Sequence, residues 1–329
     1  MLDLLGVSEG YYFALLLLSN GTVYSYGDNS KSELGLGKKT PKSTDIPQII
    51  PKLKNVVQIS SGTSHALSLD TLGRVFGWGY NNFAQVSPSL PDTVNTPYLI
   101  SSLKNIVSVS ASDDYSLALD SSGFVWEWGK SKSQDARPPL QHSLPDIVWT
   151  GATGSFSLAL NKWGRLFWWE SPANYNDDHK YPKKPDLVPF SKKILSVSAG
   201  LSHALLKAED GLLYGLGDNY NYKLITPWVD NFYKSPIEIT PAPFSSIKAF
   251  VAGGNYSAVL TNKNEVYFWG IANGVTTGKL ILLRETPTLI KIPDTLYRRI
   301  LFSGKNPLPS VPQEIKTAWR KIIRKQIIL

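Results

Sequence analysis

Along most of the chain, apolar residues alternate with small or polar residues in short stretches. In His65–Leu69 and Ser116–Leu119, leucines alternate with alanines and serines. This period of two residues is that of a β-strand, whereas a helix repeats every 3.6 residues. Asn20-Gly21 and Asp210-Gly211 follow two of these stretches, and both dipeptides favour tight turns between antiparallel strands. The pattern therefore predicts short strands joined by hairpins.

One unit that contains such a stretch occurs six times. In each copy, a β-branched segment ends in small residues, an alternating apolar segment follows, and an aromatic segment ends in Trp-Gly or a related pair. The closing residues lie 41 to 53 residues apart, and they are Gly27, Gly79, Gly129, Glu170, Gly217 and Gly270. This period is typical of a propeller blade. The fourth copy is the shortest and ends in glutamate instead of glycine.

Extended segments that contain a proline supply a fourth strand to the unit. They are Ile46–Ile50, Thr96–Ile100, Ser235–Ile239 and Thr286–Ile290. Proline is tolerated in an edge strand. A single four-stranded sheet cannot bury its faces, whereas sheets packed radially can. We therefore predict an all-β protein, a β-propeller of six to seven four-stranded blades over residues 1–305. Leu296–Ser303 either begins a degenerate seventh blade or joins the N-terminal strands.

The residues of the unit resemble a known repeat. Ser-His-Ala-Leu-x-Leu, followed by Gly-x-Val-x-x-Trp-Gly, is similar to the regulator-of-chromosome-condensation repeat. Gly27–Gly37 looks like the continuation of that repeat, with Tyr26 in place of tryptophan. The resemblance covers about residues 5–300 and implies a propeller, usually of seven blades. We expect the recurring residues to be structural, and they include His65, Trp78, Gly79, Trp128, Gly129, His203, Gly217, Trp269 and Gly270.

Few residues are available for catalysis or metal binding. The chain has no cysteine, which excludes disulfides, thiolate metal sites and cysteine nucleophiles. His65 and His203 occupy one repeat position, at or near which other copies have Phe13, Tyr115, Phe156 and Tyr256, so a structural role is favoured; His142 and His179 complete the set. No two histidines have metal-ligand spacing, and neither His-Glu-x-x-His nor Gly-x-Ser-x-Gly occurs. We expect no enzyme activity and no cofactor.

Two further motifs are interpreted as loops. Gly35–Thr40 superficially resembles a phosphate-binding loop, but its spacing is wrong and no strand-to-helix context surrounds it, so we interpret it as a blade linker. The acidic pairs Asp113-Asp114 and Asp177-Asp178 fall in predicted loops, where we expect them to be solvated. The apolar run Tyr11–Leu18 is too short for a transmembrane helix, and we identify no targeting segment.

Positive charge is concentrated at the C-terminus. The net charge is +8, and Gln313–Leu329 contains five basic residues and one acidic residue. Ile315, Trp319, Ile322, Ile323 and Ile327 share one face of a helix, which predicts a proline-containing linker and a short C-terminal amphipathic helix in residues 306–329. The candidate partner-binding residues are Lys316, Trp319, Arg320, Ile323, Arg324 and Lys325, and a second basic patch comprises Lys183, Lys184, Lys192 and Lys193. The helix either packs on the propeller, binds protein or RNA, or lies on an anionic membrane.

These features favour a binding protein over an enzyme. We expect a non-enzymatic scaffold, subunit or assembly factor of a larger complex, with protein subunits as partners and RNA or another acidic surface as an alternative. The resemblance implies chromatin binding or a role in mitochondrial ribosome or respiratory-complex assembly. It also implies a second hypothesis, guanine-nucleotide exchange on a small GTPase, although the inserted β-wedge of the founding member has no counterpart here. A third hypothesis is contact with the RNA or DNA backbone through the basic tail. We expect an intracellular protein, and the choice between mitochondrion, nucleus and cytoplasm stays open.

Overall fold

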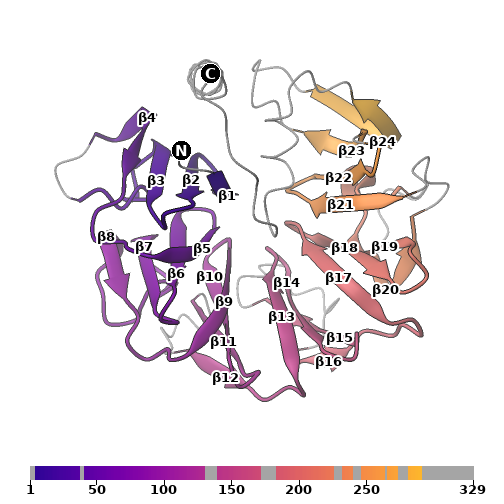
Figure 1. The fold of residues 1–329 in the computed structure, drawn as a ribbon, viewed down its shortest axis with the longest axis horizontal. Helices are drawn as coiled ribbons and strands as arrows, with labels where there is room; N and C mark the ends of the chain where they lie inside the picture. Colours follow the sequence, from indigo (N-terminus) through magenta and orange to yellow (C-terminus); the bar gives the residue numbers. More distant parts are fainter. Residues whose placement is uncertain are drawn as a thin grey trace. The chain divides into compact units, whose positions relative to one another are not determined.

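The computed structural model describes most of the repeat region (Figure 1). The described residues are 4–37, 41–129, 139–171, 183–225, 232–239, 246–263, 265–272 and 281–290. Their strands belong to two compact units, β1–β13 and β14–β24, and each unit is described by itself. The predicted C-terminal helix in residues 306–329 and the segment Leu296–Ser303 lie outside the described residues.

The first unit contains thirteen strands. They are β1 (Leu4–Glu9), β2 (Phe13–Leu18), β3 (Val23–Asp28), β4 (Ser43–Ile49), β5 (Val56–Ser61), β6 (His65–Asp70), β7 (Val75–Tyr80), β8 (Thr93–Leu99), β9 (Ile106–Ser112), β10 (Tyr115–Asp120), β11 (Val125–Gly129), β12 (Leu140–His142) and β13 (Ile147–Ala152).

The second unit contains eleven strands and a short 3₁₀-helix, η1 (Tyr220–Tyr222). The strands are β14 (Phe156–Asn161), β15 (Leu166–Glu170), β16 (Asp186–Leu187), β17 (Ile194–Ala199), β18 (His203–Ala208), β19 (Leu213–Asp218), β20 (Phe232–Glu238), β21 (Ile247–Ala252), β22 (Tyr256–Thr261), β23 (Val266–Ala272) and β24 (Ile281–Ile290).

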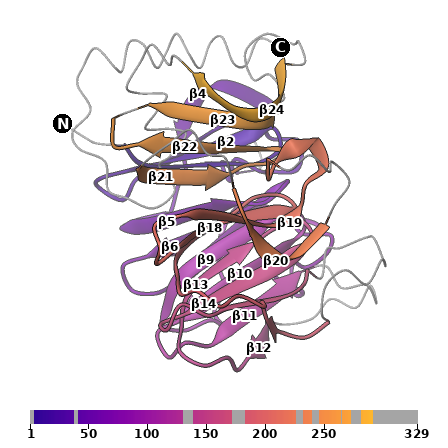
Figure 2. The ribbon, with the colours of Figure 1, turned by 90° about the vertical axis from the view of Figure 1, so that its right-hand side faces the viewer.

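Four consecutive strands form each sheet, and the described residues form six such sheets. The strand orders are β1-β2-β3-β4, β5-β6-β7-β8, β9-β10-β11-β12, β13-β14-β15-β16, β17-β18-β19-β20 and β21-β22-β23-β24. Figure 2 shows several of these sheets from the side. A series of four-stranded sheets, each made from neighbouring strands, is the architecture of a β-propeller. The predicted fold class is confirmed, with six blades in the described part of the chain.

The proline-containing segments form the outer strand of their blades. Pro47 lies in β4, Pro97 in β8, Pro236 in β20 and Pro287 in β24. Each of these strands pairs with another strand on one side only. Because an edge strand leaves half of its backbone donors outside the ladder, proline costs little there. The prediction that these segments supply the fourth strand is confirmed.

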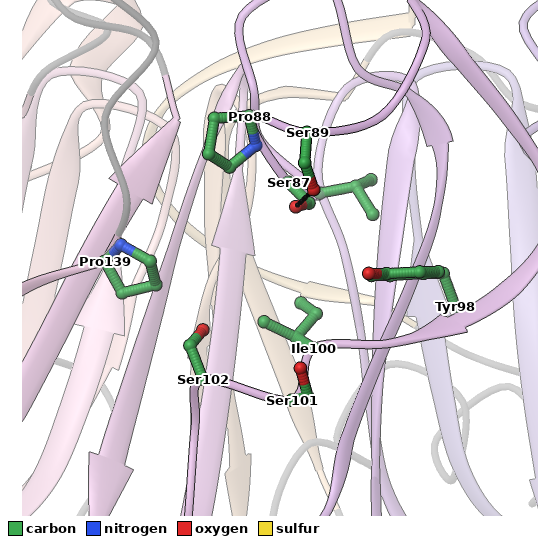
Figure 3. A pocket seen from close by; sticks show the side chains of 9 residues that line it. Ser87, Pro88, Ser89, Tyr98, Ile100, Ser101, Ser102 and Pro139 are labelled. Atoms are coloured by element: carbon green, nitrogen blue, oxygen red, sulfur yellow. Dashed lines mark hydrogen bonds between the residues drawn. The ribbon is translucent and has the colours of Figure 1, made fainter.

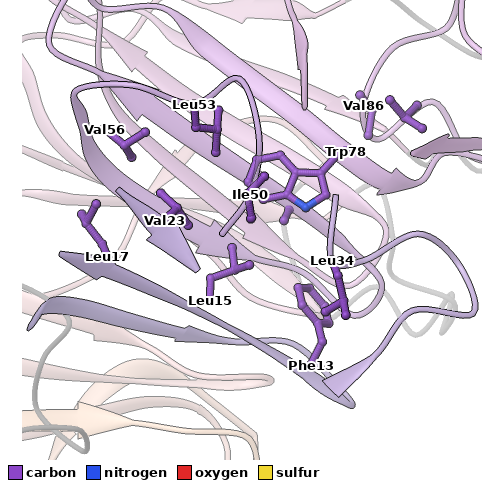
Figure 4. Packing of buried hydrophobic residues seen from close by; sticks show 12 residues of the cluster. Phe13, Leu15, Leu17, Val23, Leu34, Ile50, Leu53, Val56, Trp78 and Val86 are labelled. Atoms are coloured by element: carbon purple, nitrogen blue, oxygen red, sulfur yellow. The ribbon is translucent and has the colours of Figure 1, made fainter. Parts of the chain in front are cut away.

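The second strand of a blade forms part of two hydrophobic cores. All residues of β6 are buried, although their apolar and small side chains alternate. Leu67 and Leu69 join a cluster with Val109 and Trp128 of the following blade. Ala66 joins a different cluster, which includes Phe13 of the preceding blade; Figure 4 shows how side chains of this cluster pack. The two-residue alternation in β6 therefore separates two buried faces, with large side chains on one face and small side chains on the other.

No helix among the described residues has the length and apolar character needed to cross a lipid bilayer.

Candidate binding surfaces

The histidines of the repeat lie inside a hydrogen-bond network that joins neighbouring blades. His65 Nε2 lies 3.0 Å from Ser116 Oγ, and this hydroxyl donates to the Gln85 carbonyl at 2.9 Å. Trp128 Nε1 donates to the same carbonyl at 2.9 Å. The network therefore joins His65 and Gln85 of the second blade to Ser116 and Trp128 of the third blade.

The same network recurs in the second unit. His203 Nε2 lies 2.9 Å from Ser257 Oγ, which donates to the Lys223 carbonyl at 2.9 Å. Trp269 Nε1 donates to that carbonyl at 2.7 Å. Both histidines are buried, and burial lowers the pKa of His65 to about 4 and the pKa of His203 well below its usual range. The structure therefore places the repeat histidines as neutral links between blades, away from solvent.

Two strand positions in neighbouring blades vary together. One is the ring residue that begins the second strand of a blade, and the other is the second residue of the second strand in the next blade. Histidine precedes serine in the pairs His65–Ser116 and His203–Ser257. Phenylalanine precedes alanine in the pairs Phe13–Ala66 and Phe156–Ala204, at the same strand positions. Phe13 and Ala66 lie in one buried apolar cluster. A polar ring thus has a hydroxyl partner, and an apolar ring has a methyl partner.

Glycines are needed at two kinds of position, one beside the histidine ring and one at the end of the third strand of a blade. A Cβ atom on Gly62 would lie 2.3 Å from the His65 ring, so the ring packs directly on the glycine. At the end of the third strand, Gly79, Gly129, Gly217 and Gly270 have φ between +87° and +112°, and a Cβ there would lie 2.5–2.7 Å from a carbonyl oxygen. Left-handed backbone and lack of space both require glycine at this position. Glu170, its counterpart in the fourth blade, does not have a positive φ.

The predicted basic patch is partly neutralised by neighbouring carboxylates. Lys192 Nζ donates to Asp210 Oδ2 at 2.6 Å and also to the Tyr214 hydroxyl. The hydrogen bond with Asp210 raises the pKa of Lys192, and the bond with Lys192 lowers the pKa of Asp210 to about 2. The backbone N–H of Lys193 donates to Glu209 Oε1 at 3.1 Å. Lys183 and Lys184 are exposed. The ion pair of Lys192 with Asp210 therefore compensates one of the four lysine charges of this patch.

The second group of candidate residues cannot be placed. Lys316, Trp319, Arg320, Ile323, Arg324 and Lys325 lie outside the described residues, as does His179.

The acidic pair Asp113-Asp114 lies in the turn between β9 and β10, and both residues are half-buried and accept hydrogen bonds from side chains. Thr63 Oγ1 donates to Asp113 Oδ1 at 3.0 Å, and Gln85 Nε2 donates to Asp114 Oδ1 at 3.3 Å. Both donors come from the preceding blade, about 30 to 50 residues earlier in the chain. A loop position predicted from sequence gives no information on such a partner.

One cluster in the second unit brings a serine and a lysine together. The buried Lys223 Nζ donates to Ser202 Oγ at 2.6 Å and to Asp218 Oδ2 at 2.7 Å. Burial lowers the pKa of Lys223, and Asp218 opposes this shift. Ser202 in turn donates to Asp218 at 3.1 Å, so its proton is directed to a carboxylate instead of an amine. This geometry suits an ion pair that holds a loop, and not an activated nucleophile.

In the described part of the chain, a His–Glu pair and a cavity bear on metal and ligand binding. There, no three His, Cys, Asp or Glu side chains are grouped as metal ligands. His142 Nε2 lies 3.1 Å from Glu127 Oε2, which is a pair within one blade. A cavity of about 220 Å³ lies in the first unit (Figure 3). Its lining is uncharged and rich in serine and proline: Val86, Ser87, Pro88, Ser89, Tyr98, Ile100, Ser101, Ser102 and Pro139.

Large apolar side chains are exposed on turns and at strand starts. In the first unit, Tyr11 and Tyr12 in the β1–β2 turn are 69 % and 70 % exposed, and Leu72 in the β6–β7 turn is 70 % exposed. Val57 and Val107, the second residues of β5 and β9, are 51 % and 54 % exposed. Trp163 and Leu195 are similarly exposed in the second unit. The sequence analysis did not identify these residues, although the alternation that buries Val56 also places Val57 outside.

Comparison with known proteins agrees with the repeat and the fold. The family model of the regulator of chromosome condensation (RCC1) repeat matches residues 20–69 and 73–119, and a second model of this repeat matches residues 56–85. The guanine nucleotide exchange factor SRM1 of Saccharomyces cerevisiae is 25% identical over 325 residues, which are 92% of this chain and 65% of SRM1. The human probable E3 ubiquitin-protein ligase HERC3 is 38% identical over 88 residues, 26% of this chain and 8% of HERC3. The chain thus spans just under two thirds of the first relative and a small part of the second.

Two solved structures share the fold. Yeast RCC1 (Prp20), in its complex with Kap60, has a TM-score of 0.73 at 22% identity, covering 89% of this chain and 75% of Prp20. Human WBSCR16 has a TM-score of 0.69 at 19% identity, covering 79% of this chain and 72% of WBSCR16. A further structure of S. cerevisiae Prp20p, with a TM-score of 0.73 at 20% identity and covering 89% of this chain and 77% of Prp20p, was described with its binding properties to Gsp1p and histones.

Proposed function

Because the chain contains RCC1 repeats folded into a β-propeller, we propose that it is a non-enzymatic protein-binding propeller, a subunit or assembly factor of a larger complex. The observation that carries this proposal is the exposure of large apolar side chains on turns, such as Tyr11, Tyr12 and Leu72. A contiguous exposed apolar group on a rigid scaffold marks a protein–protein contact site, and the rings of Tyr11 and Tyr12 adjoin, with their centroids 4.3 Å apart. The repeat histidines, by contrast, are buried between blades.

Purification from native lysate tests this proposal. The tagged full-length chain is isolated with and without residues 311–329, sized by gel filtration, and its partners are identified by mass spectrometry. We expect a defined complex with protein subunits in constant ratio. Loss of the complex on truncation would assign docking to the basic tail, and its retention would assign docking to the propeller. A chain that elutes alone at its monomer size contradicts the proposal.

Guanine-nucleotide exchange is the second candidate. It is supported by the match to S. cerevisiae SRM1, which extends over 92% of this chain at 25% identity. The test is the release of labelled GDP from Gsp1p and from a panel of other small GTPases. Faster release from one GTPase, together with a nucleotide-sensitive complex, would make exchange the leading function. Unchanged release across the panel contradicts it.

A further inference from the structure

One turn is repeated almost identically ahead of two inner strands. The sequences are Leu53-Lys54-Asn55-Val56-Val57 before and into β5, and Leu103-Lys104-Asn105-Ile106-Val107 before and into β9. In both copies the leucine and the first strand residue are buried, whereas the lysine and the second strand residue are exposed. Both asparagines have φ +53°, a left-handed conformation that asparagine tolerates. Each copy thus presents one cation beside one valine.

The β6–β7 turn lies between the two copies. Thr71 N–H donates to the Asn55 carbonyl at 3.0 Å, and Ile106 N–H donates to the Gly73 carbonyl at 3.2 Å. Leu72 is therefore held between them, with 70 % of its surface exposed. The two hydrogen bonds thus link both copies through this turn in the first unit. We call the exposed side chains of the two copies and the turn, together with Lys52, the basic apolar band; it is defined by Lys52, Lys54, Val57, Leu72, Lys104 and Val107.

The positive charge of the band is not compensated within the described residues. Lys52, Lys54 and Lys104 are exposed and form no ion pair with another described residue. The nearby Asp70 carboxylate is already used, because it accepts from Arg74 at 2.6 Å and from the backbone N–H of Leu72 at 2.9 Å. The band therefore combines three lysines, unpaired among the described residues, with three exposed apolar side chains, those of Val57, Leu72 and Val107.

From this combination we infer that the basic apolar band binds an extended acidic segment of a partner protein, in which carboxylates and aliphatic side chains share one face of the segment. The inference rests on the proposed binding function and names the chemistry of the partner. In an extended segment, every second side chain points to the same side, so aliphatic groups at some of these positions can rest on Val57, Leu72 and Val107. Carboxylates at the other positions of that same face can then reach Lys52, Lys54 and Lys104.

A protein segment fits the band better than an anionic membrane does. Binding in the plane of a bilayer needs apolar groups that reach about 5–10 Å into the headgroup region. Val57 and Val107 are short, branched and only half exposed, and Leu72 alone extends from the surface. Short apolar side chains accompanied by lysines instead resemble the apolar centre and polar rim of a protein interface.

The test uses the full chain and a short fluorescein-labelled peptide in which aspartate and leucine take turns at every second position, with serine between them. Binding is measured by fluorescence anisotropy at several salt concentrations. We expect salt-sensitive binding that Lys54→Glu/Lys104→Glu weakens roughly tenfold or more, since each reversal replaces an attraction by a repulsion. Leu72→Ser should also weaken binding, and a peptide with asparagine in place of aspartate should bind poorly. Matched controls are Lys234→Glu/Lys263→Glu and Leu140→Ser, which alter exposed residues outside the band.

The outcomes separate this inference from the proposed function. Equal peptide affinity of wild type and Lys54→Glu/Lys104→Glu overturns the inference, as does equal weakening by the control variants. Binding to vesicles of phosphatidylserine and phosphatidylcholine through the same lysines, without peptide binding, overturns it in favour of a membrane. If the native complex persists in Lys54→Glu/Lys104→Glu while the peptide does not bind the wild-type protein, the inference about the band is wrong and the proposed function stands. If no native complex exists, the proposed function fails whatever the peptide does.

Discussion

At the scale of single residues, burial decides what the repeat histidines can do. His65 has no exposed surface, and its Nε2 atom is engaged by Ser116. Charging a buried imidazole costs free energy, so its pKa of about 4 lies below the usual 6.5. The ring is consequently neutral at physiological pH, where a histidine in water would be partly charged.

The shifted pKa predicts how stability depends on pH. Between pH 6.5 and 4, the unfolded chain binds a proton at His65 that the folded chain does not bind. The free energy of unfolding therefore falls as the pH falls through this range. His65→Phe should remove roughly 3 kcal/mol of this acid destabilisation, from a shift of between two and three pH units. Denaturant unfolding of both proteins at pH 8 and pH 4.5 measures the difference; parallel losses in both would contradict the assignment.

The glycines that close the blades permit a second test at this scale. Gly217 and Gly211 both have positive φ in the same blade, but only at Gly217 would a Cβ meet a carbonyl oxygen, at 2.7 Å. Gly211→Ala should cost about 1 kcal/mol for the left-handed backbone alone. Gly217→Ala should cost roughly 3 kcal/mol, because the added steric overlap must also be relieved. Tryptophan fluorescence during urea unfolding measures both losses, and equal values would contradict the steric argument.

At the scale of the strand, the sequence predicted the positions of strands, which depend on local pattern. It did not predict side-chain contacts with the next blade. Alternation and turn dipeptides located the strands, and the prolines located outer strands such as β4 and β8. The hydrogen bond from Thr63 to Asp113 joins residues 50 positions apart, and no local signal predicts it. The basic apolar band was missed for another reason. The repeated Leu-Lys-Asn was visible in the sequence, but only the hydrogen bonds of the β6–β7 turn show that the two copies are linked in the fold.

The link between neighbouring blades should show energetic coupling. Ser116→Ala leaves the buried His65 Nε2 without its hydroxyl partner, which should cost about 2 kcal/mol. The double variant His65→Phe/Ser116→Ala recreates the phenylalanine–alanine pair of Phe13 and Ala66. We expect it to lose less stability than the two single variants together. Urea unfolding of the four proteins gives the coupling free energy, and simple additivity would show that the two positions do not communicate.

At the scale of the molecule, protection from solvent should vary from strand to strand. The second strands β6 and β10 are buried throughout, whereas the outer strands β4 and β8 are largely exposed or half-buried. Local opening is easiest where few apolar contacts hold the backbone. Hydrogen–deuterium exchange with mass spectrometry should find peptides from β6 and β10 exchanging slowest and peptides from β4 and β8 fastest. Similar rates in all four strands would contradict this order.

The net charge of +8 also acts at this scale, because a basic surface increases the rate of encounter with acidic partners. Ion pairs such as Lys192 with Asp210 neutralise part of that charge, whereas Lys52, Lys54 and Lys104 keep theirs available. Where the lysines lie thus matters more for recognition than how many there are.

The matching of ring and partner residues has a consequence for how such a chain can change by recombination. Repeated genes lose or gain units when similar segments misalign, and interchangeable units would tolerate this. Here, deleting the second blade would place Phe13 before Ser116, an apolar ring facing a hydroxyl that has lost its histidine. Neighbouring blades have therefore become specific for one another, and their order is part of what the sequence encodes.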